Sequence, residues 1–430
     1  EGTNRLGKSR SARWLPTWNV AGAWNVHEEK FYSNFTNPVL SHATLKASYS
    51  LTADRGPAFV TNSQAILNSY SPWRPSASVT ESGMRITELE NSELTYEKKH
   101  EFNVGIDLGF LKNRLNLAAD YYRRNNFDLI GVINTQGAGG TIAKYANIAS
   151  MKSSGIELTI SSKNMRTKDF SWNTDFIFSK TKNEITDLKS HANVLSLISG
   201  NGFGREGYPV RGLFSIPFAG LTEDGLPTFI NQDGQKTISS FNFQEYEKLD
   251  FLKYEGPTDP TITGSFGNIL TYKNLKLNVF VTYSFGNVIR LDPVFSNAYS
   301  DLDAMPKEFK NRWMKAGDEN VTNIPTIVST RMNQQYAYLN MAYNAYNYSD
   351  VRIADGGFIR LKEISLSYDL PAKVINFFRL NKLQLKLQAT NLCLLYADSK
   401  LNGQDPEFFR SGGVSTPVPK QFTFTVRLGL

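Results

Sequence analysis

Cysteine is almost absent from this sequence of 430 residues, in which Cys393 is the single one. One thiol excludes an internal disulfide framework and any zinc site built on several cysteines. Long apolar runs are absent too, since no stretch approaches the roughly 18 consecutive apolar residues of a transmembrane helix. The sequence is therefore typical neither of disulfide-stabilised domains nor of helical membrane proteins.

Positive charge is in small excess, with 47 basic against 40 acidic residues and a net charge of +7. The basic residues are scattered and form no run, so no nucleic-acid partner is expected. The first residues, Glu1 to Lys8, show no basic segment followed by an apolar core, so we expect no signal peptide in this chain. Two interpretations follow: a cytoplasmic protein, or a mature piece of a longer one.

Motifs of enzymes are also missing. The sequence holds neither a GxSxG elbow nor a GxxxxGK[ST] loop, and its four histidines lack metal-ligand spacing. The carboxylates of Asp405 and Glu407 are close enough in sequence to suggest an acid and base pair or a cation site, but solvated side chains are the simpler interpretation. We therefore predict no catalytic residue, no metal, no cofactor and no enzymatic activity.

Aromatic residues are abundant, at 13% of the sequence, while the mean hydropathy is only −0.35. Strict alternation of apolar and polar residues, as in Leu383 to Thr390, predicts strands with one apolar and one wet face. About eleven strands are expected: four with clear alternation, at 101–110, 275–285, 383–390 and 422–430, and seven with a less regular pattern, at 17–26, 43–54, 114–124, 153–162, 170–182, 261–273 and 356–369. Most reach the roughly 9 to 11 residues that a tilted membrane-spanning strand needs.

The connections between these segments alternate between short and long. Short polar turns are expected at 110–114, 163–169 and 273–274, with 27–42 and 370–381 as longer members of the same class. Long links are expected at 55–98, 125–152, 186–260, 287–355 and 396–419. Bacterial outer-membrane barrels alternate in this way, with short periplasmic turns and long extracellular loops. The sequence thus predicts an all-β, antiparallel transmembrane β-barrel with long extracellular loops.

The number of strands leads to a further expectation. If the last strand ends on the periplasmic side, counting back eleven strands starts the chain on the extracellular side. Closed single-chain bacterial barrels have an even number of strands and do not begin there. We therefore expect a similar number of strands upstream, giving the C-terminal half of a plugged barrel of the roughly 22-stranded class.

Several short segments, in a shared order, also resemble one family. They are His100–Leu108, Asn113–Leu115, Asp120–Tyr122, Asn147–Met151, Ser154–Leu158, Phe170–Trp172, Arg312–Trp313, Gly317–Asp318, Gly357–Lys362, Tyr368–Pro371, Ala389–Leu392 and Asp405–Glu407. Together they resemble the C-terminal barrel part of SusC-like (SusC/RagA) TonB-dependent transporters of Bacteroidota. The resemblance covers nearly the whole chain.

The resemblance implies a barrel filled by a plug domain, capped by a SusD-like lipoprotein lid and driven by the TonB–ExbB–ExbD complex. Residues 1–430 would then be the C-terminal portion of the barrel, without the plug and the N-terminal strands. The function that the resemblance implies is TonB-dependent active import of nutrient oligomers, glycans or peptides, across the outer membrane. A passive outer-membrane porin is the alternative from the barrel features alone, and a surface adhesin or barrel enzyme is a third.

Recognition residues are expected in the long links, because loops carry binding groups on a rigid scaffold. The candidates are aromatic and arginine side chains that stack on sugar rings or hold peptide carboxylates. They are Trp73, Arg74, Arg205, Tyr208, Arg211, Tyr336 and Tyr338. The alternative is that they pack the loops together or hold the lid.

Two more expectations concern aromatic spacing. Met305, Phe309 and Trp313 recur at roughly helical intervals and predict a short helix within 302–317. Rings near strand ends predict aromatic belts at the level of the lipid headgroups. These rings are Tyr121, Tyr122, Trp172, Phe176, Phe178, Tyr283, Phe285 and Tyr368.

Overall fold

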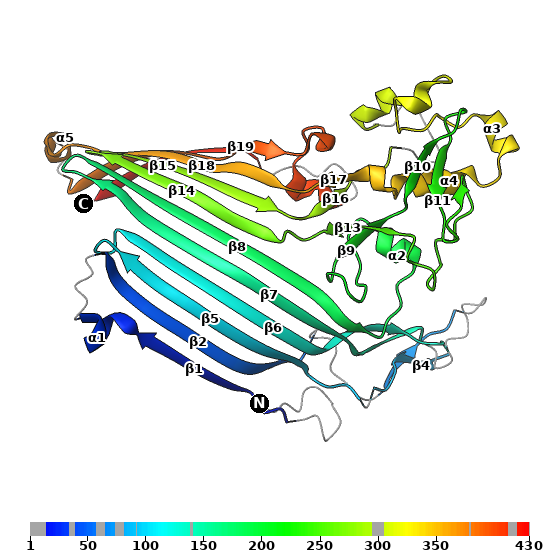
Figure 1. Cartoon of the computed structure of the whole chain (residues 1–430), viewed down its shortest axis with the longest axis horizontal. Helices are drawn as coiled ribbons and strands as arrows, with labels where there is room; N and C mark the ends of the chain where they lie inside the picture. Colours follow the sequence, from blue (N-terminus) through cyan, green and yellow to red (C-terminus); the bar gives the residue numbers. More distant parts are fainter. Residues whose placement is uncertain are drawn as a thin grey trace.

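The computed structural model describes residues 14–33, 39–56, 65–73, 81–91, 93–137, 141–294, 305–377, 380–411 and 419–429. Within them, eleven strands form one curved, open antiparallel sheet (Figure 1). In sheet order they are β1 (Trp18–Asn25), β2 (Leu40–Asp54), β5 (Glu97–Phe110), β6 (Leu115–Asn134), β7 (Ala143–Arg166), β8 (Phe170–Leu188), β14 (Ile262–Tyr272), β15 (Leu275–Phe285), β18 (Phe358–Asp369), β19 (Lys382–Ala397) and β20 (Gln421–Gly429). Each expected segment matches one of these strands.

Short and long connections lie at opposite ends of the sheet. The short ones, at 26–39, 111–114, 167–169, 273–274 and 370–381, include the small helices α1 (Lys30–Ser33) and α5 (Ala372–Phe377). The described parts of the long ones, at 55–96, 135–142, 189–261, 286–357 and 398–420, lie at the other end (Figure 1). We call these the short-turn end and the long-loop end. The alternation expected from the sequence is confirmed except at 135–142, which is shorter than the links 26–39 and 370–381 of the short class.

One expected long link, 125–152, is mostly strand. β6 continues to Asn134 and β7 begins at Ala143, with residues 130–134 paired to 143–147. Asn125 and Asn126 have low strand propensity, but the β-branched residues that follow them favour an extended chain. Asp128, at φ 57°, absorbs an irregularity in the pairing, so the two strands extend well beyond their neighbours.

The sheet has an apolar face and a polar face. Residues that pair directly across antiparallel strands point to the same side. One such row runs Leu366, Leu387 and Phe424, and another runs Val104, Tyr121 and Ile156. These side chains are substantially exposed, with Phe424 at 61% and Leu387 at 57%. An apolar surface that extends over eleven strands requires non-aqueous surroundings.

Adjacent tyrosines in β6 lie on opposite faces. Tyr121 is exposed on the apolar face, whereas Tyr122 is only 8% exposed and lies on the polar face. Tyr122 lies over Gly155, where an added Cβ would come within 2.5 Å of its hydroxyl oxygen. The prediction that Tyr122 belongs to an aromatic belt is therefore wrong, whereas Tyr121 lies on the face where a belt residue is expected.

The helix expected within 302–317 is not formed by the described residues from 305 onward. Pro306 precedes a short 3₁₀ turn, η4 (Lys307–Asn311), after which the chain is extended at Arg312. Phe309 is buried, and Met305 packs against the same hydrophobic cluster. The helical spacing of aromatic residues thus reflects packing within an irregular loop. In the described part of the chain no helix is long and apolar enough to cross a membrane.

We predict that Leu158→Lys destabilises the sheet and that Thr159→Lys does not. Leu158 lies between Ala119 and Phe178 on the apolar face, and Thr159 is its neighbour on the polar face. A lysine facing the middle of a lipid bilayer costs about 2–4 kcal/mol. Urea titration of the intact protein in lipid vesicles, followed by its heat-modifiable gel mobility, measures the difference. Equal stability of the two variants would contradict the assignment of the faces.

Candidate functional site

Two of the long connections fold together at the long-loop end (Figure 1). Residues 189–261 and the described parts of 286–357 share a hydrophobic core, and we call this unit the loop body. It contains α2 (Val194–Ile198), β9 (Gly212–Ser215), β10 (Phe218–Leu221), β11 (Pro227–Ile230), β12 (Lys236–Thr237), β13 (Lys253–Pro257), β16 (Val288–Arg290), α3 (Thr330–Gln335), α4 (Leu339–Asn347) and β17 (Ile353–Asp355). Its largest buried side chains include Phe214, Phe229, Tyr343 and Tyr346. The loops are therefore a packed scaffold.

Arg290 holds the loop body together from within. Its guanidinium donates to the carbonyl oxygens of Ile198 at 3.0 Å, Phe214 at 2.6 Å and Ser349 at 3.1 Å, and to the Ser215 hydroxyl at 3.1 Å. Burial lowers the pKa of Arg290 to about 10, which leaves the side chain cationic at neutral pH. One cation thus satisfies acceptors from both connections, and buried acceptors need such partners.

A second buried arginine joins the same region. Arg352 is 3% exposed, donates to the Asp292 carbonyl oxygen at 2.6 Å and pairs with the Glu308 carboxylate at 2.5 Å. Burial also raises the pKa of the Asp292 carboxyl. These contacts cross the second connection from its beginning to its end, so its fold depends on residues that are distant in sequence.

Asp405 and Glu407 also bind an arginine. Both carboxylates contact the Arg360 guanidinium of β18, at 2.6 Å and 2.7 Å respectively. Arg360 is 4% exposed, and so the two carboxylates anchor the loop that follows β19 to the sheet. The simpler expectation of solvated side chains is wrong for Asp405, whose side chain is 9% exposed and compensates a buried charge, whereas the Glu407 side chain is 43% exposed.

Three of the predicted recognition residues lie together inside the loop body. Arg205 lies 5.4 Å from the ring centroid of Tyr208 and pairs with Asp250 at 2.6 Å. Tyr208 packs edge-on against Phe214 at 4.9 Å. Arg211 pairs with Asp259 at 2.9 Å and donates to the Asn201 carbonyl oxygen at 3.1 Å. These side-chain contacts of all three residues are within the loop body, while the Tyr208 carbonyl oxygen accepts from the Ile185 N–H of β8 at 2.9 Å.

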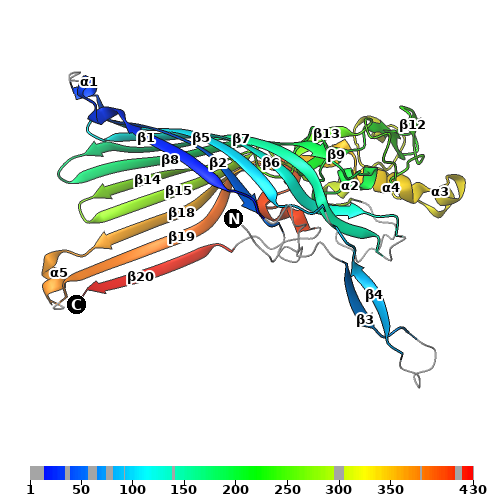
Figure 2. The same cartoon turned by 90° about the horizontal axis from the view of Figure 1, so that it is seen from below.

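Of the other predicted recognition residues, Trp73 and Tyr338 are more accessible. Trp73 is 85% exposed and follows β3 (Ile66–Tyr70), which pairs with β4 (Gly83–Glu88) in a hairpin that projects away from the sheet (Figure 2). Arg74 lies outside the described residues. Tyr336 is half-buried beside Asp224, whereas Tyr338 is 70% exposed just before α4. The structure does not bring Trp73 together with the loop-body residues.

The polar face carries a charged cluster that the loop-centred sequence reasoning missed. Glu101 accepts from Lys99 at 2.7 Å and from Arg124 at 3.0 Å, and Arg124 lies 4.1 Å from the centroid of the Tyr122 ring. Lys46 pairs with Asp107 further along the same face. The alternation of apolar and polar residues in these strands could have revealed the cluster, because these residues occupy the polar positions. Among the described residues, no group of three His, Cys, Asp or Glu side chains is arranged to hold a metal ion.

A hollow of about 480 Å³ lies beside this cluster on the sheet. Residues from β1, β2, β5 and β6 line it, among them Ser48, Asn103 and Asp120. Gly105 leaves the space that the Asp120 carboxylate occupies. The wall therefore offers hydroxyl, amide and carboxylate groups to a polar solute and no residue set for covalent chemistry.

Comparison with known proteins gives consistent relatives. No model of a protein family matches the chain. It is 24% identical to TonB-dependent receptor P3 of Formosa agariphila, over 95% of this chain and 39% of the relative. It is 25% identical to TonB-dependent receptor SusC of Bacteroides thetaiotaomicron, over 100% of this chain and 41% of the relative. A structure of the RagAB peptide transporter superposes with a TM-score of 0.77 at 23% identity, over 98% of this chain and 44% of that chain.

These findings confirm the resemblance to SusC-like TonB-dependent transporters, the all-β barrel fold and the outer-membrane location. In such a barrel the apolar face meets lipid and the polar face lines the interior. The relatives are receptors and transporters, which supports a protein that is not an enzyme. The chain spans about two fifths of the length of the curated relatives it matches.

We predict that Arg290→Met opens the loop body while leaving the eleven-stranded sheet folded. The change leaves four acceptors without their donor, and each unpaired buried acceptor costs about 1–3 kcal/mol. Limited proteolysis within 189–261 and 286–357 should accelerate by at least about 100-fold. Lys248→Ala removes an exposed pair with Asp233 and should behave like the wild type. Similar cleavage rates for both variants would contradict the role of Arg290.

We also predict that the loop body is more stable in mildly acidic solution than at neutral pH. Burial, opposed by the neighbouring Lys253, raises the pKa of the Glu255 carboxyl in β13. The folded state therefore binds this proton more tightly than the unfolded state, so its contribution is complete below about pH 4 and is lost as the pH rises through the raised pKa. Hydrogen exchange of β9 and β13 amides at pH 5 and 7 measures the effect. Glu255→Gln should reduce the difference between the two pH values, and an unchanged difference would contradict it.

Proposed function

We propose that residues 1–430 form the C-terminal portion of the barrel of a transporter that imports nutrient oligomers by TonB-dependent transport. The observation that carries this proposal is the two-faced, eleven-stranded sheet, which matches the barrel of TonB-dependent relatives along nearly the whole chain. A wet interior wall beside a lipid-facing surface is the architecture of a passage for polar solutes.

The barrel is completed by further strands of the same protein in this proposal. β1 and β20 form the two edges of the sheet among the described residues. Lipid supplies no hydrogen bonds, so an unpaired strand edge is not tolerated within the hydrocarbon region. A comparable number of additional strands would close a barrel of about 22 strands around a plug domain. The TonB–ExbB–ExbD complex would act on that plug.

The long-loop end is the proposed site of substrate capture. A SusD-like lipoprotein lid would rest on the loop body, whose packed core gives a firm surface. Among the predicted recognition residues, Trp73 and Tyr338 have the exposure that direct contact requires. Arg205, Tyr208 and Arg211 would act by holding their loops in place. The cargo is a peptide or glycan oligomer, and the RagAB relative is described as a peptide transporter.

Uptake measurements test this proposal. Cells that express the intact protein should accumulate a fluorescent oligopeptide or oligosaccharide, and loss of TonB or collapse of the proton gradient should abolish accumulation. Trp73→Ala and Tyr338→Ala should each reduce uptake several-fold, whereas Tyr272→Ala, an exposed ring at the short-turn end, should not. Uptake that persists without TonB would instead identify a passive porin.

A further inference from the structure

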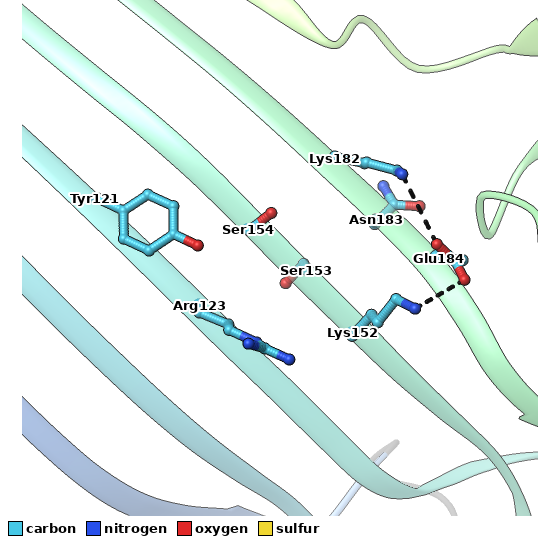
Figure 3. A pocket seen from close by; sticks show the side chains of 8 residues that line it. All are labelled: Tyr121, Arg123, Lys152, Ser153, Ser154, Lys182, Asn183 and Glu184. Carbon is cyan, nitrogen blue, oxygen red and sulfur yellow. Dashed lines mark ion pairs between the residues drawn. The ribbon is translucent and has the colours of Figure 1, made fainter.

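On the apolar face, β6, β7 and β8 change from apolar to cationic residues within a few positions. Tyr121 pairs with Ile156, which pairs with Lys180. Two residues further toward the long-loop end, Arg123 and Lys182 flank Ser154. Lys152 and Glu184 form the next pair. We call Arg123, Lys152, Lys180 and Lys182 the cationic collar, most of which Figure 3 shows beside a hollow.

The collar carries more charge than its own contacts neutralise. Glu184 lies 2.9 Å from Lys152 and 3.9 Å from Lys182. Four cations therefore face one carboxylate in this group. The Lys182 side chain is 79% exposed, and Arg123 and Lys180 are exposed as well. The hollow between them, about 210 Å³, is also lined by Ser154 and Tyr121, so it offers hydroxyl groups beside the positive charges.

The height of the collar coincides with the edge of the lipid. Lys180 lies ten residues along β8 from Phe170, at the short-turn end. At about 3.3 Å per residue and a tilt of about 45°, this distance corresponds to a height of roughly 23 Å. The apolar band of outer-membrane barrels is about 25 Å tall. Tyr121, one row below Arg123, has the exposed ring that is typical of the headgroup level.

The register excludes a role in the transport path. Substrate passes the polar face, where Glu101 and Arg124 lie, whereas the collar residues lie on the opposite, lipid-facing side. Cations at this level on the outside of a barrel meet the headgroups of the outer leaflet. Arginine and lysine bind phosphate oxygens strongly, arginine through two parallel hydrogen bonds.

We propose that the cationic collar is a binding site for the phosphate groups of an outer-leaflet glycolipid. The proposal rests on the outer-membrane location and on the long-loop end being extracellular, and it is independent of what is transported. Arg123 and Lys182 would hold the phosphate from two sides, Ser154 would donate a hydroxyl hydrogen bond, and Tyr121 would lie at the boundary with the acyl chains.

Lipid binding to the intact protein tests the proposal. The protein is delipidated in mild detergent and titrated with lipid A, and the bound lipid is counted by native mass spectrometry. The double variant Arg123→Ala/Lys182→Ala should bind lipid A about 25-fold more weakly, because each cation near a charged lipid surface contributes about fivefold. The variant Arg166→Ala/Lys168→Ala removes the same charge at the short-turn end and should bind like the wild type.

Two further arms separate the sources of phosphate. The affinity of fully dephosphorylated lipid A for the wild type should be no higher than its affinity for the double variant. Millimolar inorganic phosphate should not displace lipid A from the wild type. The charge-conserving Arg123→Lys/Lys182→Arg variant should retain most of the affinity, and heat-modifiable gel mobility should show that all variants are folded. Unchanged lipid A binding by Arg123→Ala/Lys182→Ala, or displacement by free phosphate, would overturn the proposal. The proposal would also be overturned if the Arg123→Ala/Lys182→Ala variant lost binding of a lipoprotein partner but still bound lipid A like the wild type.

Discussion

The satisfaction of backbone hydrogen bonds in a medium without water determines most of this structure. A strand within the hydrocarbon region must be paired on both sides, which favours long, regular, antiparallel strands in one continuous sheet. Among the described residues, the nine inner strands of the sheet meet this requirement, each pairing with the strands before and after it, whereas β1 and β20 have one partner each. Their side chains are then free to differ between the faces, so the same strands present apolar residues to lipid and polar residues to the interior.

Beyond the lipid the same requirement is met in another way. The connections at the long-loop end have irregular backbone, yet 189–261 and the described parts of 286–357 bury a sizeable core. Their carbonyl groups need donors that no long sheet supplies. Arg290 meets this need with one guanidinium that reaches three backbone segments. Charged side chains in these loops therefore serve the fold first, which explains why Arg205 and Arg211 are paired within it.

The sequence was sufficient for the sheet because period-two alternation is a local signal, and membrane-facing strands display it strongly. The extension of β6 and β7 was missed because Asn125 and Asn126 have low strand propensity, which their cross-strand pairs overcome. The loop body could not be inferred, since its core joins Leu197 and Phe214 to Tyr346, far along the chain. The sequence predicted only that Trp73 and Tyr338 lie in long loops. Their exposure depends on how those loops pack, which no local sequence pattern encodes.

Parity also decides what each charged residue does. Arg123 and Arg124 are neighbours in β6, yet they point to opposite sides of the sheet. Arg124 is tied to Glu101 and packs on Tyr122, so on the interior wall its charge is largely compensated. Arg123 lies at the level of the headgroups among the lysines of the collar, where the excess charge is left for an external anion. A shift of one residue in register would exchange these surroundings, which ties the position of every charge to the pairing of the strands.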